Sequence, residues 1–403
     1  MFEIRGRYAT AVCYATVVED EAVQQIRRMC DHAFTAGSRI RIMPDVHSGV
    51  GCTIGTTMTI TDKVVPNIVG VDIGCGMYTV ALGQVDLDFA RLDEAAHFIP
   101  SGRHVWEGCI ERFDLMELRC YRALKDIKRL ERSLGTLGGG NHFIEVDEAA
   151  DGTKYLVIHS GSRNLGLQVA GYYQRLAVDL NRGKAELFAA RDELIRTCKA
   201  QGRHKEIQKK LRAMEKAFQT KESGIPDDLC HLYGEYMAEY LHDVEICQRF
   251  ARRSREKMAE IILQHMDLKA KSAFHTIHNY ISTGEMILRK GAIAAHGGEM
   301  VLIPINMRDG SVLARGRGNE EWNYSAPHGA GRLMSRSKAR ETLDLEAYRA
   351  TMAGVYTTSV SEQTIDEAPM AYKSLNDIIG VIRESVDVIE ILRPIYNFKA
   401  SDS

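Results

Sequence analysis

Short apolar runs separated by glycines dominate the first 82 residues of the chain. Two of them, 39–43 (Arg-Ile-Arg-Ile-Met) and 58–60 (Met-Thr-Ile), predict strands joined by tight loops. The run 67–71 (Asn-Ile-Val-Gly-Val) is short, apolar and rich in β-branched residues, and we expect a buried strand there. Another strand signal follows at 154–158 (Lys-Tyr-Leu-Val-Ile). These segments predict a large β component.

Longer segments between the predicted strands carry patterning that is typical of helices. Residues 86–135 are mostly of this kind and end in a glycine-rich loop. Residues 168–267 are long, charged and nearly free of proline, which also indicates helices. Strands and glycine loops resume from about 284, and 374–392 predicts a closing amphipathic helix.

Strands and helices mix along the chain without a regular βαβ order. We therefore predict an α+β fold, with sheets around a central cleft and a helical excursion at 175–265. The 403 residues, with 45% hydrophobic and 26% charged side chains, are typical of a soluble globular chain, and we expect 1–403 to form a single catalytic domain.

Composition also excludes some classes of protein. The nine cysteines are an odd number without paired spacing, and the start of the chain does not resemble a signal peptide. Reduced thiols and a cytoplasmic location are therefore expected. No apolar run approaches the roughly 18 residues that a membrane span needs, so we expect no membrane partner. A net charge of −2 argues against bulk attraction to nucleic acid but permits a local basic cleft.

One stretch is locally basic. Residues 184–223 contain eleven Lys or Arg and six Asp or Glu, a balance of 11 − 6 = +5. Such a run forms either a solvated helical hairpin or an RNA-binding arm, and the sequence leaves both open.

An aspartate and a cysteine three residues apart are the first candidates for chemistry. Asp72 and Cys75 lie in the glycine-rich run 69–77, where glycines allow the backbone to turn both side chains toward one point. A carboxylate oxygen together with a thiolate suits a borderline divalent cation better than calcium or magnesium. Two residues cannot complete a metal site, so we expect imidazoles from elsewhere in the chain.

The histidines divide by their neighbours. Four lie in polar stretches of predicted helix, where surface or satisfied core positions are expected: His204, His231, His242 and His265. Five others lie at strand ends or in glycine-rich turns: His47, His142, His159, His278 and His328. Together with Asp72 and Cys75, this second set predicts a metal-centred active site.

Two glycine loops, 134–141 and 328–332, leave backbone amides free to approach a phosphate. Neither fits the P-loop pattern G-x-x-x-x-G-K-[ST], so a P-loop nucleotidase is not expected. Tight turns alone would also explain them. His328, beside the second loop, suggests a more specific role, because an imidazole can itself attack a phosphoryl group.

Nine sequence blocks resemble the RtcB family of RNA ligases, in the same order and over essentially the whole chain. They are 45–47 (Asp-Val-His), 70–77 (Gly-Val-Asp-Ile-Gly-Cys-Gly-Met), 140–145 (Gly-Asn-His-Phe-Ile-Glu), 159–163 (His-Ser-Gly-Ser-Arg), 278–280 (His-Asn-Tyr), 289–292 (Arg-Lys-Gly-Ala), 328–332 (His-Gly-Ala-Gly-Arg), 366–373 (Asp-Glu-Ala-Pro-Met-Ala-Tyr-Lys) and Lys399. The blocks around Cys75 and His328 are the most specific.

The resemblance implies a ligase that joins RNA ends bearing a 2′,3′-cyclic phosphate or 3′-phosphate to 5′-hydroxyl ends, using GTP and two Mn²⁺ ions. It implies a shared thiolate at Cys75, one metal site completed by Asp72 and His142, and a second completed by His159 and His278.

By the same resemblance, His328 is the nucleophile that accepts GMP, and Asp45 orients its ring. Cofactor contacts are implied for a larger set: Asn141, Glu145, Asn306, Gly329, Ala330, Gly331, Tyr372 and Lys399, among which Glu145, Tyr372 and Lys399 form the guanine pocket. Because joining needs a short phosphate-binding track, we also expect Arg163, Arg317 and Arg332 to contact RNA near the cleft.

Three positions depart from the family pattern. Val50 stands where a lysine is usual, Asn306 where a serine is usual, and Pro327 replaces the serine before the nucleophile. They resemble a divergent branch, some members of which are thought to repair RNA beside a release-factor-like protein. The expected partners are GTP and broken tRNA or rRNA, with an archease-like activator or a release-factor-like protein. A phosphoesterase that opens cyclic phosphates, and an RNA-binding protein with a relict site, remain the alternatives.

Overall fold

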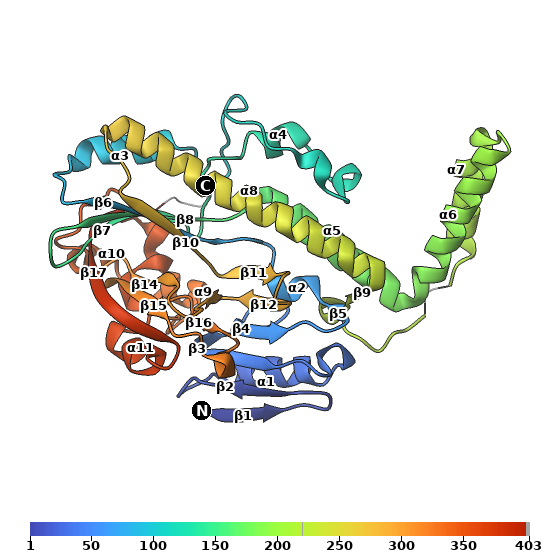
Figure 1. The fold of residues 1–403 in the computed structure, drawn as a ribbon, viewed down its shortest axis with the longest axis horizontal. Coiled ribbons are helices and arrows are strands. Elements are labelled where there is room, and N and C mark those ends of the chain that lie inside the picture. The colour runs from blue at the N-terminus through green and yellow to red at the C-terminus, as the bar shows by residue number, and fades with distance from the viewer. Residues whose placement is uncertain (220, 400–403) are drawn as a thin grey trace.

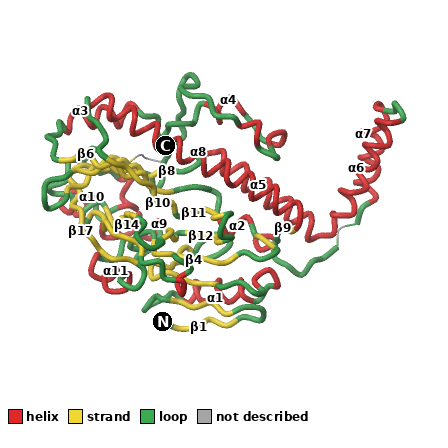
Figure 2. The backbone as a smooth tube through the Cα atoms, viewed as in Figure 1, coloured by secondary structure: helices red, strands yellow, loops and turns green. Residues whose placement is uncertain are grey.

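The computed structural model describes residues 1–219 and 221–399 and has the expected α+β architecture (Figures 1 and 2). A mixed sheet with the order β1-β2-β3-β4-β12-β11 contains β1 (Phe2–Arg5), β2 (Thr10–Cys13), β3 (Ile40–His47), β4 (Ile54–Thr59), β12 (Ile287–Lys290) and β11 (Asn279–Ser282). The strands predicted at 39–43 and 58–60 are therefore confirmed as β3 and the end of β4, which extends to residue 59.

A second, antiparallel sheet has the order β10-β6-β8-β7-β17-β15-β14. It contains β10 (Ser272–Ile277), β6 (Gly76–Gly83), β8 (Lys154–Ser160), β7 (Phe143–Glu148), β17 (Val386–Lys399), β15 (Gly310–Gly316) and β14 (Met300–Asn306). Two short pairs complete the strands: β13 (Ala292–Ala294) with β16 (Ser325–Pro327), and β5 (Lys63–Val64) with β9 (Leu232–Tyr233). The strand predicted at 154–158 is confirmed as part of β8.

The 33-residue helix α8 (Gly234–Met266) runs along the body and contacts β6, β8 and β11 (Figure 1). Its buried positions recur three or four residues apart, as an amphipathic helix requires: Met237, Tyr240, Val244, Cys247, Ala251, Ser254, Met258, Ile262 and Met266. Helices α3 (Phe89–Phe98) and α5 (Arg163–Asp179) pack against it. Helices α6 (Ala185–Ala200) and α7 (Ile207–Ala217) extend away from the body between α5 and α8 (Figure 1).

The helices expected at 168–267 are thus confirmed. The remaining helices are α1 (Asp20–Cys30), α2 (Pro66–Val69), α4 (Ile127–Glu131), α9 (Arg336–Thr342), α10 (Leu345–Thr351) and α11 (Leu375–Ile382). Among the described residues, no helix combines the length and apolar character needed to cross a bilayer.

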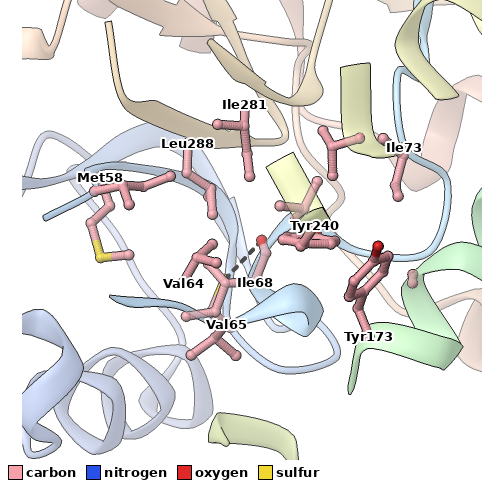
Figure 3. Packing of buried hydrophobic residues seen from close by; sticks show 14 of the residues in the cluster. Met58, Val64, Val65, Ile68, Ile73, Tyr173, Tyr240, Ile281 and Leu288 are labelled. Carbon is pink, nitrogen blue, oxygen red and sulfur yellow. Dashed lines mark hydrogen bonds between the residues drawn. The ribbon is translucent and has the colours of Figure 1, made fainter. Parts of the chain in front are cut away.

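A large apolar core holds α2 between the mixed sheet and the long helices. Figure 3 shows Ile68 of α2 among Val64, Leu288, Ile281 and Tyr240, which come from β5, β12, β11 and α8. All five are almost completely buried. The core fixes α2, and with it the turn that carries Asp72.

The strand predicted at 67–71 is wrong, and within the run only Ile68 and Val69 are buried, whereas Val71 is 49% exposed. Pro66 begins α2 at the first helical position, where its fixed φ and missing N–H are tolerated. The helix ends at Val69 and is followed by Gly70, whose φ of 93° is accessible to glycine. Proline therefore outweighed the β-branched composition of the run.

Two other expectations need correction. In 86–135 the α-helices are only α3 and α4, because Pro100 and Gly102 follow α3 and short 3₁₀ turns fill the interval. In 374–392 the helix α11 ends at Ile382, and β17 begins at Val386 and pairs with β15 and β7. The Val-Asp-Val-Ile-Glu-Ile run starting at 386 favours a strand. Strands also resume earlier than expected, at β10.

Candidate active site with two metal-ligand groups

The turn between α2 and β6 brings Asp72 and Cys75 to one point. Gly74 has a φ of 78°, and a Cβ there would lie 2.9 Å from the Gln248 Cα of α8, so this turn requires glycine. The Asp72 carboxylate accepts a hydrogen bond from the Ser162 backbone N–H at 3.0 Å. A Cβ at Gly161 would lie 2.1 Å from Asp72 Oδ1, so a second glycine makes room for the carboxylate.

Three imidazoles converge on this turn from the antiparallel sheet and its loops. His142 precedes β7, His159 lies in β8, and His278 lies between β10 and β11. The Nε2 atom of His142 is 3.5 Å from Cys75 Sγ and 3.0 Å from Asp72 Oδ2. The Nε2 atom of His159 is 3.4 Å from Cys75 Sγ and 2.9 Å from His278 Nε2.

Backbone carbonyls set the tautomers of two of these rings. His142 Nδ1 is 2.9 Å from the Leu137 carbonyl oxygen, and His159 Nδ1 is 3.0 Å from that of Asn141. A carbonyl only accepts, so each Nδ1 carries the proton and each Nε2 presents a lone pair. A hydrogen bond from the ring nitrogen that does not face the metal site is typical of metal-ligating histidines.

These side chains form two groups that share the thiol. The first consists of Asp72, Cys75 and His142, and the second of Cys75, His159 and His278; within each, the ligand atoms lie within 4.8 Å of one another. The structure therefore brings together all five residues expected to bind metal. Soft sulfur with imidazole and one carboxylate suits Mn²⁺, Fe²⁺ or Zn²⁺.

The electrostatics of the thiol and carboxylate fit a cation between them. Burial, with the nearby Asp72 carboxylate, raises the pKa of the Cys75 thiol well above its usual value. Burial also tends to raise the pKa of Asp72, but the hydrogen bond and charge of His142 outweigh it and lower that pKa to about 2. Burial lowers the pKa of His159 and His278 well below the usual value, which keeps both rings neutral. A bound cation would favour thiolate and neutral imidazole together.

His328 lies beside the second metal-ligand group and is fixed by Asp45. The His328 ring centroid is 4.8 Å from that of His278. Its Nδ1 is 2.7 Å from Asp45 Oδ2, which also accepts the His328 backbone N–H at 3.1 Å. Asp45 is fully buried and its carboxylate oxygen accepts, so Nδ1 carries a proton and Nε2 is the ring nitrogen that Asp45 does not hold.

A cavity of about 210 Å³ joins these elements. It is lined by the residues expected to contact the cofactor: Asn141, Glu145, Asn306, Gly329, Ala330, Gly331, Tyr372 and Lys399. His159, His278 and His328 also line it. The cavity places the predicted nucleotide contacts beside the predicted nucleophile and one metal-ligand group.

Glu367 organises one wall of this cavity and was not singled out from the sequence. Its carboxylate accepts hydrogen bonds from Lys399 Nζ at 2.6 Å and the Tyr372 hydroxyl at 2.7 Å, and Arg336 lies 2.8 Å away. Burial tends to raise the pKa of Glu367, but Lys399 and Arg336 outweigh it and lower the pKa to about 2. Phe143, under the Lys399 ammonium at 5.8 Å, is a second lining residue that the sequence did not single out.

The three arginines expected to contact RNA lie in different surroundings. Arg163 begins α5 and lies beside the first metal-ligand group. Its guanidinium and the His142 ring both lie next to Gly138, where a Cβ would meet the two side chains. Arg332 lines the cavity and donates to Tyr372 and Glu367. Arg317 is exposed, donates to the Arg383 carbonyl at 2.7 Å and is not among the cavity residues. The structure therefore brings two of the three to the site.

None of the three residues that depart from the family pattern belongs to a metal-ligand group. Val50 is 79% exposed, and the Lys290 ammonium, from another part of the chain, donates to its carbonyl oxygen. Asn306 lines the cavity while its side-chain oxygen accepts the backbone N–H of Asp309 at 2.9 Å. Pro327, the residue before His328, lies in β16 and pairs with Ala292 of β13.

Comparison with known proteins agrees with this arrangement. The model of one protein family, described as tRNA-splicing ligase RtcB, matches residues 25–105 and 109–400. The RNA-splicing ligase RtcB of Escherichia coli strain K12 is 33% identical over 420 residues, which cover 94% of each chain. The tRNA-splicing ligase RtcB of Thermococcus kodakarensis is 27% identical over 428 residues, which cover 88% of this chain and 86% of the relative. The chain belongs to the RtcB family.

Proposed function

We propose that this protein is an RNA ligase that joins 2′,3′-cyclic phosphate or 3′-phosphate ends to 5′-hydroxyl ends, with GTP as co-substrate. The observation that carries the proposal is the position of His328. An imidazole held through Nδ1 by a buried carboxylate lies directly beside a metal-ligand group, in a cavity large enough to admit part of a nucleotide.

The metal groups support two Mn²⁺ ions per chain, with Cys75 as the shared ligand. Asp72 and His142 would complete one site, and His159 and His278 the other. When bound, such ions neutralise phosphate charge and polarise the reacting oxygens. The chain contributes the rest: Leu137 and Asn141 carbonyls keep the lone pairs of the first two imidazoles directed inward.

His328 would act first. Its Nε2 lone pair attacks the α-phosphorus of GTP, a phosphorus–nitrogen bond forms, and the bond to the pyrophosphate leaving group breaks. The ring becomes cationic as this happens, and Asp45 stabilises that charge through Nδ1–H. A 2′,3′-cyclic phosphate end is first opened by water to a 3′-phosphate. GMP then passes from His328 Nε2 to an oxygen of this 3′-phosphate, and the phosphorus–nitrogen bond breaks. The 5′-hydroxyl attacks the RNA phosphorus, releases its proton to solvent and displaces GMP.

The nucleotide wall has the donors and acceptors that guanine requires. The base offers donors at N1 and N2 and an acceptor at O6. Glu145 can accept from the first two and Lys399 can donate to the third, while Tyr372 and Asn141 lie along the same cavity. Adenine presents the opposite pattern at N1 and the exocyclic group, so this pair favours GTP over ATP.

The substrates we propose are tRNA or rRNA fragments with broken ends, in RNA repair or tRNA maturation. An archease-like activator or a release-factor-like partner, and a cytoplasmic location, stay predictions from the sequence.

Incubation with Mn²⁺ and α-labelled GTP, followed by a denaturing gel, tests the proposal. We expect a labelled protein band that is acid-labile and alkali-stable, and joined RNA when both ends are supplied. Loss of the label under every metal tested, with cyclic phosphate still opened, would instead favour the phosphoesterase alternative that Val50 and Pro327 suggest.

A further inference from the structure

Helices α6 and α7 form an arm that leaves the body between α5 and α8 (Figure 1). The arm lies in the basic stretch 184–223, whose balance is +5 although the whole chain carries −2. Neither the metal-ligand groups nor the cavity contains a residue of this stretch. The proposed catalytic chemistry therefore leaves the arm unexplained.

Two opposite stripes divide the surface of α7 and its flanking residues. Ile207, Leu211, Met214 and Phe218 recur at helical spacing and are half-buried, on a helix that contacts α6. A second set has the same spacing but starts two residues earlier, which places it on the opposite face, and all four are exposed: Lys205, Lys209, Arg212 and Lys216. We call this second set the basic stripe.

Three acidic residues of the arm pair with basic residues outside the stripe. Glu215 pairs with Arg191 of α6 at 3.3 Å, and Glu206 pairs with Lys210 at 2.9 Å. Glu193 pairs with Arg196 within α6 at 3.0 Å. Within the described part of the chain, the four residues of the basic stripe have no such ion pair, so their charges face solvent together.

We propose that the basic stripe binds the phosphate backbone of the RNA substrate away from the ends being joined; this rests on the proposed ligase function. From Lys205 to Lys216 the stripe spans twelve residues, and the eleven steps between its ends correspond to about 16 Å along a helix, enough to meet several phosphates of one strand. Exposed lysine and arginine side chains contact phosphate groups and do not distinguish one base sequence from another. An arm that leaves the body suits an RNA longer than the cleft can hold.

The test compares two variants that remove the same charge. The arm variant carries Lys205→Gln, Lys209→Gln, Arg212→Gln and Lys216→Gln. The control carries Arg27→Gln, Lys125→Gln, Lys128→Gln and Lys269→Gln. These are also three lysines and one arginine, all exposed, and none forms an ion pair within the described part of the chain. Both sets lie on the surface, so circular dichroism should show the wild-type fold.

We expect the arm variant to bind tRNA halves at least tenfold more weakly at low salt. The slope of log affinity against log salt concentration should become less negative by about 3, because each of the four lost contacts to a single-strand phosphate contributes about 0.7 to this slope. Labelling by GTP and joining of short oligonucleotides should match the wild type. The control should change affinity for tRNA halves much less.

Equal losses in the two variants would overturn the proposal, since bulk charge would then explain the binding. Unchanged affinity for tRNA halves in the arm variant would also overturn it and would assign the stripe to an acidic protein partner. Failure of the ligase proposal is distinguishable, because it would abolish GTP labelling in the wild type while RNA binding can still be measured.

Discussion

Asp45 and His328 are joined by two contacts to one oxygen atom: Asp45 Oδ2 lies 2.7 Å from the ring Nδ1 and accepts the backbone N–H of the same histidine at 3.1 Å. The two residues are 283 positions apart in the sequence. A Cβ at Gly331 would lie 2.9 Å from the Asp45 carbonyl oxygen, so the glycine loop closes tightly over the pair. The contact fixes which nitrogen of His328 is free to react.

Asp45→Asn should slow labelling by GTP at least about 100-fold, because an amide keeps the shape but cannot stabilise the cationic ring. Metal content and fold should not change, since Asp45 belongs to neither metal-ligand group. Single-turnover labelling with α-labelled GTP measures the rate. A wild-type rate in Asp45→Asn would show that the carboxylate does not assist His328.

Cys75→Ala should reduce the bound Mn²⁺ from two ions per chain to one or none, because both ligand groups contain this thiol. Cys247→Ala is a matched control: Cys247 is equally buried and lies in α8, outside both groups. Metal analysis after gel filtration measures the stoichiometry. Full metal content in Cys75→Ala would refute the shared-ligand role.

Glu367 should make the free energy of unfolding depend on pH in the acid range. Its folded pKa of about 2 lies below the ordinary 4.5, so its contribution is present above pH 4.5 and is lost as pH falls toward 2. The stability difference between wild type and Glu367→Gln should therefore shrink by about 2 kcal/mol between pH 5 and pH 3. Urea unfolding at each pH measures it, and Glu341→Gln, at an exposed position, is the control. A difference that is constant with pH would contradict the ion pair with Lys399.

Arg163→Ala should weaken RNA joining more than labelling by GTP, because this arginine lies beside the Asp72 and His142 group and outside the nucleotide cavity. Arg317→Ala, exposed and bonded to the Arg383 carbonyl, should have the smaller effect. Separate rates for labelling and joining test both variants. Equal loss of both activities in Arg163→Ala would assign the residue to nucleotide binding or to the fold.

The sequence predicted much of the fold where one pattern acted alone. Short apolar runs marked β3 and β8, and the proline-poor charged segment marked α5 to α8. Prediction failed where local signals competed, as at Pro66, whose ring starts a helix in a β-branched run. It also failed at 386–392, which was assigned to the end of a helix although its β-branched residues favour the strand that pairs with β7 and β15.

The candidate site was predictable in its residues but not in its contacts. The family blocks identified Cys75 and the histidines, whereas their distances depend on pairing of β6 with β8 and β10. The role of Glu367 in the cavity wall could not be predicted from the sequence, because its partner Lys399 lies 32 positions away. Arg317 looked similar to Arg163, and only the tertiary structure separates them.

The central claim is that His328 accepts GMP, and labelling of His328→Ala by α-labelled GTP in the presence of Mn²⁺ tests it most directly. His47→Ala is the matched control, because His47 Nδ1 contacts the Asp45 carbonyl at 3.0 Å and its ring lines the same cavity. We predict no label on His328→Ala with both metals still bound, and a labelled His47→Ala. A His328→Ala protein that still becomes labelled would contradict the account, and loss of the label in His47→Ala alone would move the nucleophile to His47.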